Sequence, residues 1–212
     1  MGFIYTQQTV TSTQFESTPD LDVVDVYVDP ACPWAWRGSR FMVEVTRHLP
    51  LTIAWRTFSL KLINEGKSHP RTKFHSLGLA ALRALCIIRR DSGNDGFERL
   101  YSEIGSAAHD HRLDLSSSLL QGAVERAGFD ASLIEAATTD PTTLSEVKEE
   151  HEIAVARVGA FGVPTIILSN GKGIFGPVLD SVPTGTSAVR LWTQVHDMIN
   201  RNEFYELKRR RR

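Results

Sequence analysis

The residues with the clearest chemical potential lie in segment 29–36, which reads Asp-Pro-Ala-Cys-Pro-Trp-Ala-Trp and holds one of the two cysteines of the chain. Cys32 follows an apolar run and precedes Pro33, whose fixed φ and missing N–H suit the first position of a helix. At a helix N-terminus, the unpaired N–H groups and the positive end of the helix dipole favour a thiolate over a thiol. Because the thiolate is the nucleophilic form, the segment predicts a reactive cysteine.

A buried structural cysteine is the alternative interpretation of Cys32, because free cysteine is among the residue types most often found in protein cores. The helix-starting proline and two tryptophans that can roof a pocket, Trp34 and Trp36, favour the reactive interpretation. Cys86 differs, since it lies in an apolar stripe at helical spacing. We therefore expect Cys86 to fill the core and the two cysteines to remain unpaired.

Two strands and a helix are expected around the reactive segment. The run 23–28 is rich in β-branched and aromatic residues and predicts a short buried strand, and apolar residues at helical spacing predict a helix over 33–48. The alternating segment 51–58 predicts a second strand. Together they form a βαβ unit, in which the strands are parallel and the helix packs on the sheet. Segments 64–67 and 69–70 are typical of loops.

Between about residues 71 and 160 the apolar period changes to 3.6, which predicts a block of four or five helices. Turn-forming residues divide the block at 92–96, 113–116, 128 and 140–141. The last helix is the clearest, since Asp140 can cap it and Pro141 suits its first position. Its apolar stripe is expected to contain Leu144, Val147, His151, Val155 and Val158. His151 is thus expected to be a packed core residue rather than a ligand.

The strand pattern returns after the helices. Residues 162–168 are typical of a turn and a buried strand, and the turn-forming residues 169–173 before 174–175 predict a β-hairpin. Apolar residues at helical spacing over 188–199 predict a closing helix. At the other end, residues 1–20 are polar and are expected to form a weakly ordered leader.

Length and composition are those of an ordinary globular chain. The 212 residues, 42% of them hydrophobic and 23% charged, suffice for one good core. The formal net charge is −1, and the basic end, 208–212, is interpreted as a solvated terminus, so we expect no nucleic-acid partner. No apolar run approaches the roughly 20 residues that span a bilayer, and residues 1–20 lack a signal-peptide pattern. We therefore expect a cytoplasmic protein with no membrane partner.

The order of the expected elements resembles a known fold. A Cys-Pro-Trp-Ala segment at 32–35, paired with Gly-Val-Pro-Thr at 162–165, is similar to the DsbA-like branch of thioredoxin-fold proteins. The segments 175–179, Phe-Gly-Pro-Val-Leu, and 204–209, Phe-Tyr-Glu-Leu-Lys-Arg, resemble the actinobacterial mycothiol-dependent nitroreductase family. The resemblance runs from about residue 21 to the C-terminus. It implies an α/β chain with a DsbA-like thioredoxin fold.

The resemblance also implies how the chain is divided. Residues 21–66 and 160–212 are expected to form the thioredoxin-like domain. Residues 67–159 would form a helical domain inserted between the second and third core strands, and the leader 1–20 would precede both.

The resemblance further implies a substrate site around Cys32. In such folds the proline before the third strand is cis and lies against the reactive cysteine, which implies a cis bond between Val163 and Pro164. The Val163 backbone would bind a docked thiol and Thr165 would line the floor. An ordinary loop proline ahead of a strand is the alternative for Pro164. The residues implied to bind the thiol or the substrate are Pro33, Trp34, Ala35, Asn64, Val163, Pro164 and Thr165.

One histidine joins Cys32 as a candidate catalytic residue by the same resemblance. His109 would orient a bound thiol or a reducible substrate, or donate a proton near neutral pH. The alternative is a histidine that stabilises its own helix C-terminus through the dipole. Asn64 is alternatively a turn residue. No metal site is expected.

Ala35 departs from the pattern of the family, since most members carry a second cysteine at that position. A dithiol enzyme resolves a mixed disulfide with its second thiol, so here an external thiol must release Cys32. This predicts a cytosolic monothiol thiol-disulfide oxidoreductase or thiol transferase that uses mycothiol or glutathione as co-substrate and acts on small molecules, with a homodimer left open.

Two other functions stay open. Related thioredoxin-fold enzymes, the kappa-class glutathione transferases and hydroxychromene-carboxylate isomerases, activate a bound thiol without bonding to it. The remaining alternative is a non-catalytic binding protein that kept the fold after losing the second cysteine.

Overall fold

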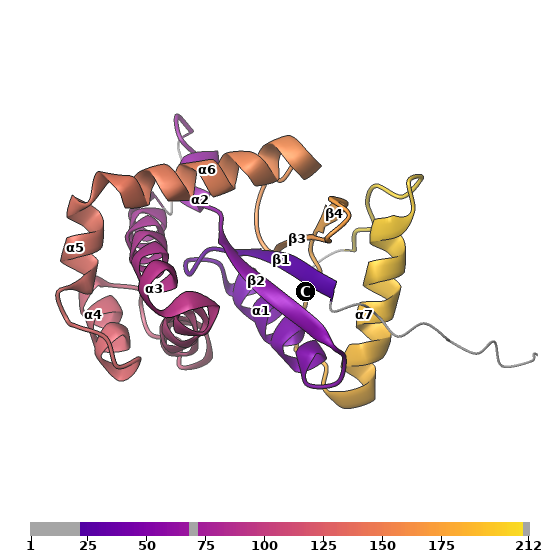
Figure 1. Cartoon of the computed structure of the whole chain (residues 1–212), viewed down its shortest axis with the longest axis horizontal. Helices are drawn as coiled ribbons and strands as arrows, with labels where there is room; N and C mark the ends of the chain where they lie inside the picture. Colours follow the sequence, from indigo (N-terminus) through magenta and orange to yellow (C-terminus); the bar gives the residue numbers. More distant parts are fainter. Residues whose placement is uncertain (1–21, 68–71, 210–212) are drawn as a thin grey trace, which may run out of the picture.

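The computed structural model describes residues 22–67 and 72–209 and contains a four-stranded sheet in the order β2-β1-β3-β4 (Figure 1). The strands are β1 (Asp22–Val28), β2 (Leu51–Thr57), β3 (Thr165–Ile167) and β4 (Gly173–Phe175). β1 pairs in parallel with β2 and antiparallel with β3, and β3 pairs antiparallel with β4. The predicted βαβ unit and β-hairpin are confirmed. The predicted leader, 1–20, and the loop 69–70 lie outside the described residues.

Two helices pack against each other beside the sheet. Helix α1 (Pro33–Thr46) connects the parallel strands and ends at Thr46 rather than at residue 48, and α7 (Gly185–Asn200) closes the chain as predicted. α1 fully buries Phe41, Met42 and Val45, which form its apolar stripe. The helix that begins at Cys32 is therefore held firmly on the sheet.

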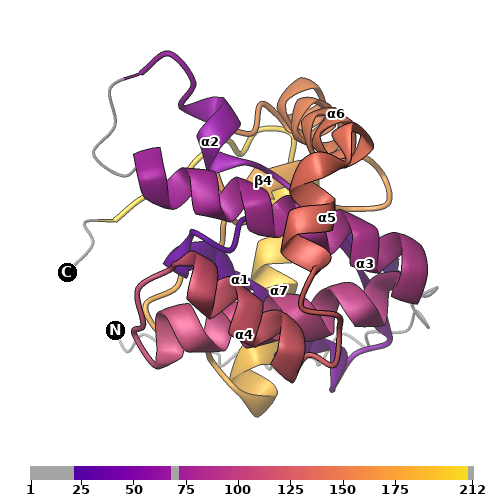
Figure 2. The same cartoon turned by 90° about the vertical axis from the view of Figure 1, so that its left-hand side faces the viewer.

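The other helices form a block to the left of and above the sheet in Figure 1. They are α2 (Leu60–Ile63), α3 (Thr72–Gly105), the π-helical η1 (Ser106–Asp110), α4 (Ser117–Arg126), α5 (Leu133–Thr139) and α6 (Pro141–Val158). Figure 2 shows α4 and α5 against α3. The predicted break at 92–96 is a kink at Gly93, whose φ of 66° suits glycine. The single turn of α2 is too short to produce a visible period and was not predicted.

Helix α6 begins as predicted but buries a different face. Asp140 caps it by accepting a hydrogen bond from the Thr142 N–H at 2.9 Å, and Pro141 follows. The predicted stripe is wrong at Val155, which is 38% exposed, whereas Glu150 is buried. The buried face consists of Thr143, Val147, Glu150, His151 and Ala154. Glu150 is buried because its carboxylate forms ion pairs and hydrogen bonds beside the sheet. The pattern of polar and apolar residues in the sequence does not show such partners.

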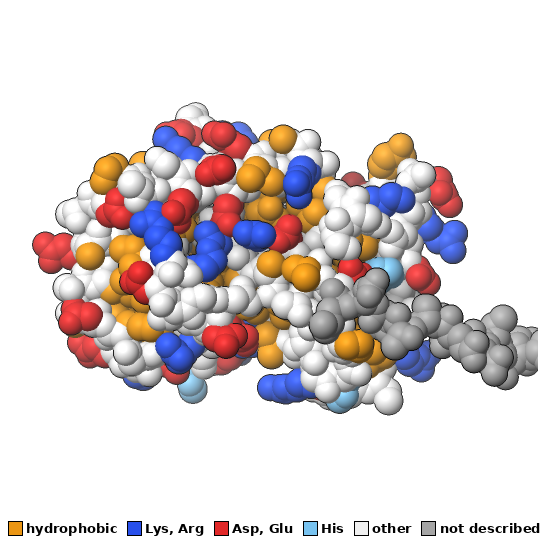
Figure 3. Space-filling model, in the orientation of Figure 1, with side chains coloured by type: hydrophobic (Ala, Val, Ile, Leu, Met, Phe, Trp, Pro, Cys, Tyr) orange, Lys and Arg blue, Asp and Glu red, His pale blue; other side chains and the backbone are white. Residues whose placement is uncertain are grey.

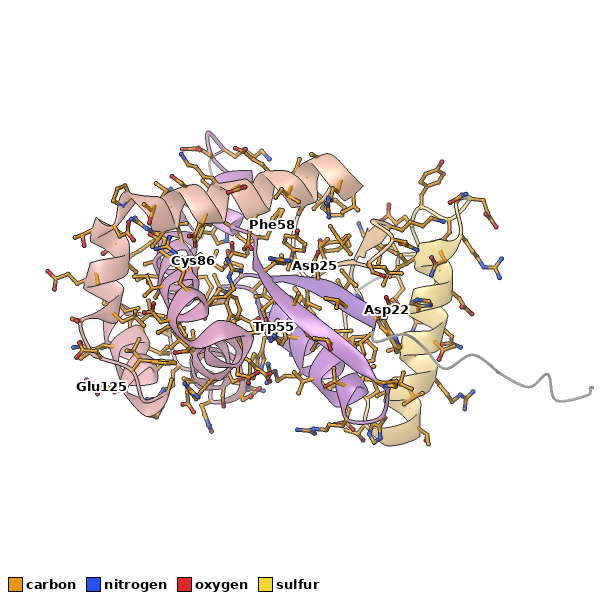
Figure 4. The ribbon with its side chains drawn as sticks, in the orientation of Figure 1. Asp22, Asp25, Trp55, Phe58, Cys86 and Glu125 are labelled. Carbon is orange, nitrogen blue, oxygen red and sulfur yellow. The ribbon has the colours of Figure 1, made fainter. Side chains whose placement is uncertain are left out.

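One hydrophobic core runs from the sheet into the helical block. Trp55 of β2 stacks on Phe97 of α3 with ring centroids 6.3 Å apart, and lies 6.0 Å from the Tyr101 ring. Tyr101 in turn lies 5.8 Å from Trp36 of α1. Figure 4 shows Trp55 between β2 and α3. This aromatic cluster places the start of α1 directly beside the inserted helices.

Candidate active site

Cys32 caps the N-terminus of α1, as predicted. Its backbone is extended, with φ −104° and ψ 111°, and its Sγ accepts a hydrogen bond from the Ala35 N–H at 3.4 Å. The same sulfur donates to the Val163 carbonyl oxygen at 3.4 Å. The residue is 7% exposed. Because an N–H group and the positive end of a helix dipole point at Sγ, negative charge on the sulfur is stabilised there.

The turn before β3 faces Cys32. The Val163–Pro164 peptide bond is cis, and Val163 turns its carbonyl to the cysteine sulfur. Thr165 is fully buried, and its Oγ1 donates to the Gly162 carbonyl at 2.8 Å. The hydroxyl therefore holds the turn in shape. The predicted contacts of Val163, Pro164 and Thr165 with a substrate stay predictions.

A cavity of about 270 Å³ opens beside the cysteine. The described residues that line it are Ala31, Cys32, Pro33, Trp34, Leu60, Asn64 and His75. The structure thus brings four of the predicted site residues to one cavity, since Cys32, Pro33, Trp34 and Asn64 all lie on it. Its walls are mainly apolar with a few polar groups, which is the usual character of a small-molecule site.

A second cavity of about 340 Å³ lies between α6 and the sheet and has a different character. Its walls include Glu150, which forms ion pairs with Arg56 at 3.4 Å and with Arg89 at 2.9 Å. The face drawn in Figure 3 likewise carries basic and acidic side chains interspersed. Because these charges satisfy each other, we place the candidate active site at the smaller cavity, beside the cysteine.

Asn64 and His75 supply polar side chains to the cavity that Cys32 also lines. Asn64 ends α2 and its Nδ2 donates to the Leu60 carbonyl at 2.8 Å, so it is both a turn residue and a lining residue. His75 lies near the start of α3 and is 5% exposed. Sequence reasoning missed His75, because no spacing relates it to Cys32 and only the fold brings α3 to the cavity.

His109 lies on η1 and contacts the backbone of the reactive segment. Its Nε2 lies 2.9 Å from the Pro30 carbonyl oxygen, which only accepts, so Nε2 carries the proton. Burial lowers the pKa of His109, and this effect exceeds the opposing effect of the bond to Pro30. The neutral ring therefore supports the loop before Cys32, and it is not among the described residues that line the cavity. Its predicted catalytic role stays a prediction.

Asp29 is a completely buried carboxylate at the base of the same loop. One oxygen accepts from the Ala31 N–H at 2.8 Å and the other from the Leu60 N–H at 2.7 Å. Desolvation raises the pKa of Asp29 to about 6, although both hydrogen bonds oppose the shift. Asp29 thus joins the loop before Cys32 to the start of α2, and its role was also missed from the sequence.

The two tryptophans of the reactive segment have different environments. Trp34 lines the cavity, but Trp36 is only 4% exposed, so the prediction that both roof a pocket is wrong for Trp36. The Trp36 indole donates to the Asp110 carboxylate at 2.8 Å and lies in close contact with Gly105, where a side chain has no room. Trp36 therefore holds the reactive segment to η1 and the end of α3.

Cys86 lies within α3 and is completely buried, as predicted (Figure 4). Both cysteines are free, and burial raises the pKa of the Cys86 thiol to about 12. A thiol so held is neither exposed nor ionised at neutral pH, so it is a poor candidate to resolve a disulfide at Cys32.

The described part of the chain has neither a cluster suited to a metal ion nor a helix suited to a membrane. No group of three or more His, Cys, Asp or Glu residues in ranges 22–67 and 72–209 is arranged to hold a metal ion. None of the helices in these ranges is both long and apolar enough to cross a bilayer.

Comparison with known proteins finds matches that cover most of the chain. A family model described as "Rv2466c-like: Mycothiol-dependent nitroreductase Rv2466c" matches residues 31–209. The "Uncharacterized protein Rv2286c" of Mycobacterium tuberculosis (strain ATCC 25618 / H37Rv) is 37% identical over 196 residues, which are 89% of this chain and 82% of that protein.

Two solved structures show the fold. The probable DsbA oxidoreductase SCO1869 of Streptomyces coelicolor has a TM-score of 0.58 at 19% identity, covering 88% of this chain and 93% of that one. A 2-hydroxychromene-2-carboxylate isomerase has a TM-score of 0.54 at 19% identity, covering 83% and 94% respectively. The predicted DsbA-like thioredoxin fold is confirmed.

Proposed function

This chain belongs to the Rv2466c-like, mycothiol-dependent nitroreductase family, and from that premise we propose that it is a cytoplasmic monothiol thiol-disulfide oxidoreductase or thiol transferase. The observation that carries the proposal is that Cys32 has no second reactive thiol beside it. Cys32 borders the cavity at the start of α1, whereas position 35 is alanine and the other cysteine, Cys86, is buried in α3. A disulfide formed at Cys32 therefore has no partner thiol within the chain that can resolve it.

The reaction we propose has two exchange steps. The Cys32 thiolate attacks one sulfur of a small disulfide RS–SR, so that a bond from Cys32 to that sulfur forms, the S–S bond breaks and RS⁻ leaves. A second low-molecular-weight thiol then attacks the substrate sulfur of the mixed disulfide. This releases Cys32 as a thiolate and a new disulfide, so that the incoming thiol is oxidised and the original disulfide is reduced.

The character of the cavity favours mycothiol over glutathione as the co-substrate. Mycothiol is an acetylated cysteine joined to two sugar-like rings and is uncharged outside its thiol, whereas glutathione carries two carboxylates and an ammonium group. The described lining residues include no Asp, Glu, Lys or Arg. Because the two carboxylates and the ammonium group of glutathione would lose hydration in a site whose described lining offers only the His75 ring as a charged partner, the neutral thiol is the better match.

The proposal is tested by intact-mass measurement after incubation with oxidised mycothiol and, separately, oxidised glutathione. We expect one mycothiol adduct that persists until reduced thiol is added and then disappears, with less adduct from glutathione. Cys32→Ser is expected to abolish the adduct and Cys86→Ser to retain it, because only Cys32 borders the cavity.

The variant Ala35→Cys sharpens the test. With a second thiol three residues after Cys32, the adduct is expected to be lost without added thiol, as an internal disulfide replaces it. Absence of any adduct on the wild-type chain from either disulfide would contradict the proposed function.

A second candidate is activation of a bound thiol without a covalent bond, as in the hydroxychromene-carboxylate isomerases named above. It is favoured by the hydrogen bonding of Cys32, whose S–H donates to the Val163 carbonyl, because a protonated sulfur at the cavity can instead donate to the sulfur of a bound thiolate. Under this function Cys32→Ser retains turnover with an isomerisation or conjugation substrate. Complete loss in that variant favours the exchange reaction.

A further inference from the structure

We propose that His75 is the proton-transfer residue of the Cys32 site, an inference that rests on the proposed exchange reaction. His75 is 5% exposed near the start of α3 and lines the 270 Å³ cavity together with Cys32 and Asn64. Neither the resemblance nor the comparisons assign it a role. A histidine on the wall of a cavity that also contains the nucleophile can reach the sulfur atoms of a bound disulfide.

Two titratable groups beside the loop, His109 and Asp29, are hydrogen-bonded to backbone groups and are not among the described residues that line the cavity. His109 holds its proton on Nε2 against the Pro30 carbonyl, and both Asp29 oxygens accept backbone N–H groups. Asn64 has an amide, which neither gains nor loses a proton near neutral pH. Among the described lining residues, His75 and Cys32 are the ones with titratable side chains.

The exchange reaction needs such a group because an alkyl thiolate is a poor leaving group. When Cys32 attacks RS–SR, the departing RS⁻ takes the proton from the His75 imidazolium and leaves as RSH, which makes His75 neutral. The incoming thiol R′SH then returns its proton to His75 and attacks the substrate sulfur as R′S⁻. Cys32 leaves as a thiolate and His75 is again protonated, so the cycle converts RSSR and R′SH into RSH and R′SSR.

The test compares two disulfides whose leaving thiolates differ in whether they need a proton to depart. Hydroxyethyl disulfide releases a basic alkyl thiolate, whereas an aromatic disulfide that releases nitrothiobenzoate gives a thiolate stable without protonation. In His75→Gln and His75→Ala we expect the rate with the alkyl disulfide to fall on the order of 100-fold, within the usual range for general acids. The rate with the aromatic disulfide is expected to change by less than about threefold.

Two controls separate proton transfer from a structural role. Imidazole added to His75→Ala is expected to restore turnover of the alkyl disulfide, because the truncated side chain leaves room at the cavity. A second histidine variant, His111→Gln at the exposed residue that ends η1, is expected to resemble wild type with both disulfides. Equal losses with the two disulfides in the His75 variants, or no rescue by imidazole, would overturn the inference.

A measurement on the unmodified protein keeps the inference testable if the His75 variants do not fold. Across disulfides of increasing leaving-group basicity, the wild-type rate is expected to vary little, whereas a free cysteine derivative slows steeply. A steep dependence in the protein would also overturn the inference. If instead the wild type reacts with neither disulfide, the proposed function fails, and this outcome is distinct from retained activity in the His75 variants.

Discussion

Asp29 shows at the scale of a single residue how the reactive segment is held in place. Its carboxylate bridges the N–H of Ala31, next to Cys32, and the N–H of Leu60 at the start of α2, both of which border the cavity. A buried carboxylate that accepts two N–H groups fixes geometry at a cost in desolvation. That cost should be visible as a pH dependence of stability.

We predict that the stability of the wild-type chain depends on pH between about 4 and 6 in a way that Asp29→Asn does not. The folded pKa, raised to about 6, exceeds the ordinary value of 3.8. The unfolded state therefore ionises first as pH rises, and the folded state loses stability until its own pKa is passed. One pKa unit corresponds to about 1.4 kcal/mol, so the loss relative to the variant is roughly 3 kcal/mol.

Urea unfolding of both proteins from pH 4 to pH 8 measures this difference. Asparagine cannot accept from both N–H groups, since its amide nitrogen is a donor, so the variant is expected to carry an additional penalty that does not change with pH. A difference in unfolding free energy that stays constant over the whole range would contradict the prediction.

At the scale of elements, the position of the cis-proline turn depends on one close approach to α1. A Cβ at Gly38 would lie 2.9 Å from Cβ and Cγ of Pro164, closer than such atoms pack. We predict that Gly38→Ala lowers the free energy of unfolding by about 1–3 kcal/mol, the usual cost of overpacking, and slows alkylation of Cys32 by displacing the turn.

A matched helix glycine provides the control for Gly38. Gly122 lies in α4, and a Cβ there would meet only the guanidinium end of Arg126, at 3.2 Å. Because that flexible group can move, Gly122→Ala is expected to stabilise the protein by up to about 1 kcal/mol through helix propensity. Urea unfolding and alkylation rates check both variants, and equal behaviour of the two would refute the role of the close approach.

The elements show which parts of the structure a single sequence can predict. Cys32, Pro33 and the β-branched run before them carry local signals, and the strand, the helix start and the capped cysteine were predicted correctly. The buried face of α6 was not, because Glu150 is inside through ion pairs while Val155 is 38% exposed. Burial that depends on a distant charged partner leaves no trace in a pattern of polarity.

The site itself was predictable only in part, for the same reason. Trp34 and Asn64 line the cavity as the resemblance implied, but His75 does so because the fold lays α3 beside Cys32. Trp36 looks like Trp34 in the sequence and is buried because η1 supplies a carboxylate for its indole. Contacts across the helical block therefore decide residue roles that local spacing leaves open.

At the scale of the whole molecule, the inserted helices and the sheet share one core. Trp55 of β2 stacks on Phe97 of α3, and Glu150 of α6 is bound at the end of β2. Its Oε2 accepts from Thr57 through the N–H at 2.7 Å and the hydroxyl at 2.6 Å, and Arg89 lies 2.9 Å from its Oε1. The proposed division into a thioredoxin-like domain and an inserted domain thus concerns chain order, and we expect the two parts to unfold together.

We predict that Glu150→Gln lowers the free energy of unfolding by about 3 kcal/mol, because it leaves the half-buried Arg89 without its carboxylate. The neighbouring exposed Glu149→Gln is expected to change stability by less than about 0.5 kcal/mol. Circular dichroism reports the helices, most of which lie in the block. Tryptophan fluorescence reports the thioredoxin-like part, which holds all four tryptophans: Trp34, Trp36, Trp55 and Trp192. Urea transitions followed by the two signals should coincide in the wild type. If the helical signal were lost before the fluorescence changes, the sheet would fold independently of the helical block. The contacts of Glu150 would then not explain how the Cys32 site is positioned.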